Sequence, residues 1–175
     1  MTQWRDDPRL KGRFHPEYPD DLQVVIHEGG FRLSKNPPEL AWVRVVERQG
    51  DVFKGRLLNK PFNLATIQEG SIIEFVVPAG GEHLVMVTEK YISERPQWSI
   101  HPCPECGFSE LLDAPSDFIR VVFPGIPAGE VMTCFTYFCP FCRTSGLVVE
   151  NKALREGELP RPSDRPRKRW WKFWE

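Results

Sequence analysis

Four of the five cysteines form two short motifs with the same spacing. Cys103-Pro104-Glu105-Cys106 and Cys139-Pro140-Phe141-Cys142 are C-P-x-C units separated by 32 residues. Two residues between the cysteines let both thiolates of a tight turn point at one ion, and proline presets φ inside that turn. Four thiolates close a tetrahedral shell and leave no position for water or substrate. The spacing therefore predicts one structural Zn²⁺ per chain, held by Cys103, Cys106, Cys139 and Cys142.

Paired cysteines are also typical of redox dithiols and iron–sulfur clusters. The duplicated unit and the absence of a βαβ pattern favour zinc over a dithiol, while iron stays open. The fifth cysteine, Cys134, lies inside a predicted strand and is interpreted as a core thiol. His101, two residues before Cys103, is interpreted as a neighbour of the site rather than a ligand. Gly107 suits a positive φ after the first turn, and Arg143 takes the same place in the second.

The C-terminal segment 165–175 reads RPRKRWWKFWE and mixes cations with aromatic rings. Tryptophan and basic residues together suit a membrane surface, a protein interface or single-stranded nucleic acid. A solvated tail, or one folded back on the body, is the other interpretation. Because prolines and charges precede the aromatic cluster, we expect residues 155–175 to be a disordered basic and aromatic tail. Its predicted partner-binding residues are Arg167, Lys168, Arg169, Trp170, Trp171, Phe173 and Trp174.

Motifs of the common catalytic classes do not occur in the sequence. There is no G-x-S-x-G, no H-E-x-x-H, no Walker loop and no G-x-G-x-x-G after a strand. No catalytic residue and no small-molecule substrate are therefore predicted. An enzymatic function is therefore less favoured by the sequence than a binding function.

The charge distribution indicates which partners are disfavoured, and the cysteine content indicates the cellular compartment. The 175 residues carry a net charge of −1, divided into −4 for residues 1–154 and +3 for 155–175. An acidic body disfavours a duplex-binding protein, which normally shows a basic stripe. Five cysteines without a charged and apolar leader or an apolar run near 18 residues indicate a reducing compartment. The expected localisation is cytoplasmic.

The secondary structure that must position the cysteine motifs consists of short runs of β-branched residues separated by glycine and proline. The pattern predicts hairpins around Gly50 and around 78–81, a third hairpin around 124–129, and a helical turn or two over Glu89–Arg95. The fold class is therefore mainly β, α+β at most: a small sheet or half-barrel with a zinc-ribbon-like module and a disordered tail. The predicted strands are Leu22–His27, Leu40–Arg48, Val52–Leu58, Ser71–Val77, Leu84–Thr88, Phe118–Phe123 and Val131–Phe138.

Residues 39–98 carry a second pattern: a strand with Trp42, then Gly55-Arg56-Leu57-Leu58-Asn59-Lys60-Pro61, Gly70 before a hydrophobic strand, and Trp98. This pattern resembles the YegJ-like family of uncharacterised bacterial domains. The resemblance implies a small β-rich fold and no established activity. By analogy with related small bacterial domains that act as immunity proteins beside toxins, it also implies partner binding.

Together these features predict four regions: an irregular lead-in over 1–21, a YegJ-like β domain over 22–99, a zinc-ribbon-like module over 100–154 and the tail over 155–175. The favoured function is a non-catalytic cytosolic zinc-binding protein that acts as a protein-interaction module. The alternative is a zinc-ribbon nucleic-acid-binding protein that uses the basic aromatic tail.

Overall fold

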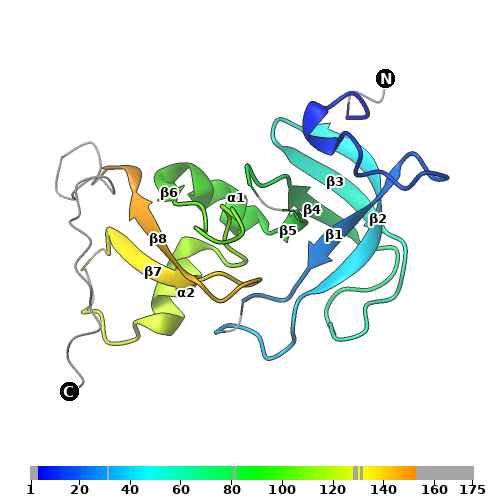
Figure 1. The fold of residues 1–175 in the computed structure, drawn as a ribbon. Helices are drawn as coiled ribbons and strands as arrows, with labels where there is room; N and C mark the ends of the chain where they lie inside the picture. Colours follow the sequence, from blue (N-terminus) through cyan, green and yellow to red (C-terminus); the bar gives the residue numbers. More distant parts are fainter. Residues whose placement is uncertain (1–3, 31, 81, 128–129, 131, 153–175) are drawn as a thin grey trace, which may run out of the picture.

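The computed structural model describes residues 4–30, 32–80, 82–127, 130 and 132–152. Figure 1 shows two β structures side by side, a five-stranded barrel and a three-stranded sheet, joined by short helices. The prediction of a mainly β protein is confirmed. None of the helices in the described part of the chain has the length and apolar character that a bilayer crossing requires.

The barrel is a meander closed by one parallel pairing. Neighbouring strands pair antiparallel from the first to the fifth, and the first and fifth pair in parallel through Val24 with Leu84 and Val25 with Val85. Where the sequence suggested a half-barrel, the sheet is fully closed. Its strands are β1 (Asp21–Ile26), β2 (Glu39–Gln49), β3 (Val52–Leu57), β4 (Ile72–Val76) and β5 (Leu84–Val87).

Local sequence explains how β2 and β3 meet. Gly50 has φ 62°, a conformation that glycine adopts without steric cost, and Gln49 pairs with Val52 across the tight turn. Alternation along β3 buries Phe53 and Leu57 in the barrel. Gly55 lies between them where a Cβ would come within 2.2 Å of Val43 Cγ1, so only glycine fits this wall.

The N-terminal segment packs against the barrel core. Trp4 and Leu10 are buried among the barrel residues. A 3₁₀ turn, η1 (Pro8–Leu10), begins at Asp7, whose carboxylate accepts from the Arg9 backbone N–H and pairs with the Arg9 and Arg48 guanidinium groups. The hydrogen bonds from Arg9 hold the pKa of Asp7 at about 2 although the carboxylate is buried.

The second structure is the antiparallel sheet β6-β8-β7 with helix α2 packed on it. Trp98, Phe135 and Val148 meet in its core, and the Phe118 ring of α2 stacks on Phe135 with centroids 5.2 Å apart. The elements after the barrel are α1 (Glu89–Glu94), η2 (Arg95–Gln97), β6 (Trp98–Ile100), α2 (Pro115–Val122), β7 (Cys134–Phe138) and β8 (Ser145–Glu150).

The predicted strand Phe118–Phe123 is wrong, because these residues belong to α2 and the turn after it. The helix begins after Ala114 with Pro115 in its first turn, where a missing N–H costs nothing, and Asp117 there is favoured by the helix dipole. Packing of its apolar face on β7 outweighs the β-propensity of the Ile and Val residues. The third predicted hairpin therefore does not form around 124–129. The hairpin is β7–β8, with the second cysteine motif at its tip.

Candidate metal centre

Each C-P-x-C motif forms the same hydrogen-bonded turn. The Cys103 N–H donates to the Phe108 carbonyl at 2.8 Å, and the Gly107 N–H donates to the Cys103 carbonyl at 2.8 Å. In the second motif the Cys139 N–H donates to the Thr144 carbonyl at 2.8 Å, and the Arg143 N–H donates to the Cys139 carbonyl at 3.0 Å. The two turns are therefore equivalent residue by residue. We call the turns at 103–107 and 139–143 the first and second knuckles, and the sheet β6-β8-β7 together with both knuckles the ribbon.

The residue after each second cysteine adopts a left-handed backbone conformation. Gly107 has φ 74° and Arg143 has φ 66°, and Arg143 is the only non-glycine residue with positive φ in the described part of the chain. A side chain in this region costs about 1 kcal/mol. The second turn therefore carries a conformational cost that glycine avoids in the first.

The four cysteine sulfurs form one cluster. The Sγ atoms of Cys103 and Cys142 are 3.3 Å apart, those of Cys106 and Cys139 3.5 Å, and all four lie within 4.8 Å of one another. A disulfide would need about 2.05 Å. A tetrahedral ion with metal–sulfur bonds of about 2.3 Å places its sulfurs about 3.8 Å apart. The donor set and its spacing fit a metal ion, so these four cysteines could hold one.

The cluster lies where the ribbon packs on the barrel. Cys103 and Cys139 are buried in one apolar group with Val25 of β1 and Val85 of β5, the two strands that close the barrel. Phe108 is also buried in this group, and the centroids of its ring and the Phe141 ring are 4.8 Å apart. The other two cysteines, Cys106 and Cys142, are more accessible. Two of the four cysteines of the candidate metal centre are thus part of the contact between barrel and ribbon.

The protein environment pushes the thiol pKa values apart. Burial raises the pKa of Cys139 to about 12 and also raises the pKa of Cys106. Hydrogen bonds from the Thr144 hydroxyl and backbone N–H lower the pKa of Cys142 to about 6. These opposite shifts favour the thiolate form of Cys142 and the protonated forms of Cys106 and Cys139.

Metal binding is expected to release protons at pH 7. Ligation requires all four thiolates, so at least the protons of Cys106 and Cys139 must leave when the metal enters. Metal affinity should consequently fall as the pH is lowered. Adding Zn²⁺ to chelator-stripped protein in weakly buffered solution should release two or more protons per metal bound. Release of fewer than one would contradict four-thiolate binding.

The remaining candidate residues from the sequence do not join the cluster in the described part of the chain. Cys134 begins β7 on the side of the strand opposite Phe135 and Tyr137, as alternation predicts, but it is only half-buried, so its interpretation as a core thiol is wrong. His101 is not a member of the cluster, and its Nε2 is buried without a hydrogen-bond partner among the described residues. The predicted tail residues Arg167, Lys168, Arg169, Trp170, Trp171, Phe173 and Trp174 lie outside the described residues.

Sequence reasoning missed the contacts that hold the centre against the barrel. Gly80, in the β4–β5 loop, lies so close to the first knuckle that a Cβ would be 2.3 Å from the Gly107 carbonyl oxygen. The His83 ring, in the same loop, contacts Phe141 with centroids 5.4 Å apart. The sequence does not indicate these contacts, because Gly80 and His83 lie in a loop far along the chain from Gly107 and Phe141, and no sequence pattern links the two regions.

The fold and the site define a small β-barrel protein with a ribbon that carries a four-cysteine cluster able to bind a metal. No family model, curated protein or solved structure matches the chain. The resemblance of residues 39–98 to the YegJ-like family therefore stays a prediction.

Proposed function

We propose that the chain is a non-catalytic cytoplasmic protein whose ribbon binds one structural Zn²⁺ and which acts as a protein-interaction module. The observation that carries the proposal is the cluster of four cysteine sulfurs within 4.8 Å of one another on two equivalent knuckles. Four thiolates fill a tetrahedral shell, so the ion would contribute folding energy rather than activate water. The proposed ligands are Cys103, Cys106, Cys139 and Cys142.

Packing around the cluster supports a structural role for the ion. Cys139 is fully buried and Cys103 is 3% exposed, both against barrel residues. The ribbon, residues 98–150, is shorter than the about 70–80 residues below which a single apolar core rarely stabilises a fold alone. A bound metal would supply the missing cross-link. Zn²⁺ suits this purpose because it has no redox chemistry and prefers four tetrahedral ligands.

The environment of the buried histidine also supports a role without catalysis. The His27 side chain is 1% exposed, its Nε2 lies 2.8 Å from the Met86 carbonyl oxygen, and its Nδ1 accepts from the Gly29 N–H at 3.1 Å. Both ring nitrogens are engaged with backbone groups, and burial lowers the pKa of His27. The ring is therefore a neutral structural element with its proton on Nε2.

Protein purified without added metal is expected to contain one zinc per chain. Elemental analysis by mass spectrometry, with protein concentration from amino-acid analysis, checks the number. The same sample should show no absorption bands in the visible range, because a thiolate-bound iron centre would be coloured. Less than about half an equivalent of zinc, or a stoichiometric amount of iron, would contradict the proposal.

The nucleic-acid alternative rests on residues 165–175, which lie outside the described part of the chain. Near the first knuckle, the acidic side chain of Glu110 is paired with Arg95 at 2.8 Å. Residues 1–154 carry a net charge of −4, which disfavours binding to a duplex. We therefore propose the protein-interaction role alone.

A further inference from the structure

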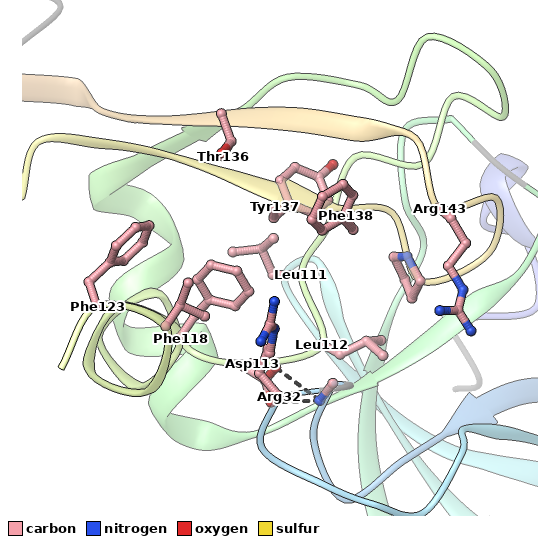
Figure 2. A pocket seen from close by; sticks show the side chains of 13 residues that line it. Arg32, Leu111, Leu112, Asp113, Phe118, Phe123, Thr136, Tyr137, Phe138 and Arg143 are labelled. Atoms are coloured by element: carbon pink, nitrogen blue, oxygen red, sulfur yellow. Dashed lines mark hydrogen bonds between the residues drawn. The ribbon is translucent and has the colours of Figure 1, made fainter.

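A cleft of about 630 Å³ lies between α2, β7 and the loop that follows β1. Figure 2 shows Phe118 and Phe123 of the α2 region on one side, Tyr137 and Phe138 of β7 above them, and Arg32 and Asp113 below. Pro140 and Arg143 of the second knuckle also line it. The cleft is separate from the cysteine cluster, but the knuckle that carries two of the cysteines forms one of its walls.

One wall of the cleft is apolar. Leu111, Phe118 and Phe123 contribute carbon surface from the α2 side. Phe138 is 64% exposed, an unusual position for a phenylalanine on a folded sheet. Phe118 and Phe123 are half-buried beside it. An exposed aromatic ring next to partly exposed apolar surface in a cleft favours binding, because covering this surface releases water from it.

The β7 wall is the edge of a sheet. Successive side chains of a strand point to opposite faces, yet the consecutive residues Thr136, Tyr137 and Phe138 all line the cleft. The cleft therefore runs along the edge of β7 rather than under one face. In the described residues the sheet order is β6-β8-β7, so only one edge of β7 is paired. An open edge offers backbone N–H and carbonyl groups to an added strand.

The charged residues of the cleft are two arginines and one aspartate whose carboxylate is already engaged. Both oxygens of Asp113 accept from the Gly30 N–H, each at 2.9 Å. Arg32 is exposed, and no carboxylate of the described residues lies within 4.0 Å of its guanidinium group. Arg143 adds a second positive charge to the lining. The cleft thus combines an apolar wall with positive charge, and an acidic occupant complements it.

We propose that this cleft binds an extended peptide segment of a partner protein, which adds to the free edge of β7. Its large apolar side chains would pack between α2 and Phe138, and an acidic side chain would pair with Arg32. The proposal rests on the protein-interaction role above and names the chemistry of the partner. A peptide fits better than a small molecule because the wall is a strand edge with repeating backbone groups.

Selection from a phage-displayed library of random heptapeptides on the full, metal-loaded chain tests the proposal. The selected sequences should combine Phe, Trp, Leu or Val with Asp or Glu. Synthetic copies with a fluorescent label should then bind the protein in an anisotropy titration. Enrichment of basic peptides, or no enrichment, would overturn the proposal.

Two variants locate the binding. Arg32→Glu should weaken the selected peptides at least tenfold, and a peptide with its acidic residue changed to Lys should recover most of that loss. Arg120→Glu is the matched control, because Arg120 lies on α2 with its side chain 75% exposed and outside the cleft lining. It should change the affinity less than twofold. Equal effects of the two variants would overturn the proposal.

Two further measurements separate the possible failures. Phe138→Ser should also weaken binding tenfold, with the metal content of every sample measured alongside. Peptides whose affinity does not change in either Arg32→Glu or Phe138→Ser would overturn the cleft as the binding site and leave the interaction role standing. A wild-type chain that holds no metal as purified and takes up none when Zn²⁺ is added would count against the proposed function itself. Binding that occurs only in a chain ending at Gly157 would assign the cleft to residues 158–175 of the protein itself and overturn the proposal.

Discussion

Replacing Cys139 with serine is expected to release the metal and to unfold the ribbon. Cys139 is fully buried in the group that joins ribbon and barrel, so the change removes a ligand and leaves a hydroxyl in an apolar contact. In small zinc peptides the metal contributes about 10–16 kcal/mol, as much as the about 5–15 kcal/mol that stabilises a whole domain. The melting temperature should therefore fall by more than about 10 °C, at about 2–4 °C per kcal/mol for a chain of this size.

Cys134→Ser is the matched control for this experiment. It makes the same chemical change at a half-buried cysteine of the adjoining strand β7, outside the sulfur cluster. This variant should keep one metal per chain and melt within about 3 °C of the wild type. Calorimetry and elemental analysis on both variants give the two readouts. A Cys139→Ser protein that keeps its metal and melts like Cys134→Ser would show that the cluster does not stabilise the fold.

The barrel strands could be predicted well from the sequence because their ends are local signals. Gly50 and Asp51 mark the β2–β3 turn, and Pro78 with the following residues marks the β4–β5 turn. The closure of the barrel was not predictable in this way. It depends on two pairs between β1 and β5, residues about 60 positions apart in the chain, and no local pattern encodes such a parallel pairing.

The α2 region shows the opposite error, a local pattern that tertiary packing overrides. Phe118–Phe123 is rich in β-branched and aromatic residues, which favours a strand. A helix start signal lies just before it, in Pro115 and Asp117, and the strand prediction did not take it into account. The stacked rings of Phe118 and Phe135 then hold the helix on the sheet.

The two sites differ in how much of each a sequence can reveal. The cysteine cluster was visible because each pair of ligands sits within four residues, so spacing alone describes the turn. The cleft was not visible, because Arg32, Phe118 and Phe138 come from three elements whose meeting depends on the whole fold. The residues of a site that is assembled from distant parts of the chain have no characteristic spacing in the sequence, so a sequence analysis does not detect them.

Gly80→Ala is expected to destabilise the protein by forcing the ribbon away from the barrel. Its Cβ would lie 2.3 Å from the Gly107 carbonyl oxygen and 3.0 Å from the Gly107 carbonyl carbon. These are backbone atoms of the first knuckle, which cannot rotate away as a side chain would. Overpacking of this kind costs about 1–3 kcal/mol, which corresponds to a melting temperature lower by about 5 °C.

Gly125→Ala is the control for Gly80→Ala, because neither glycine has a φ in the left-handed region and a Cβ at Gly125 meets nothing within 4 Å. The control should melt within about 1 °C of the wild type. Since Gly107 follows Cys106 directly, Gly80→Ala should also speed the loss of metal to an excess of chelator, whereas Gly125→Ala should not. Faster metal loss together with a lower melting temperature would show that the barrel holds the knuckle in its ligating conformation. Equal stability and equal metal release in the two variants would mean that ribbon and barrel are not in contact at Gly80 in solution, and that the cluster is held by the ribbon alone.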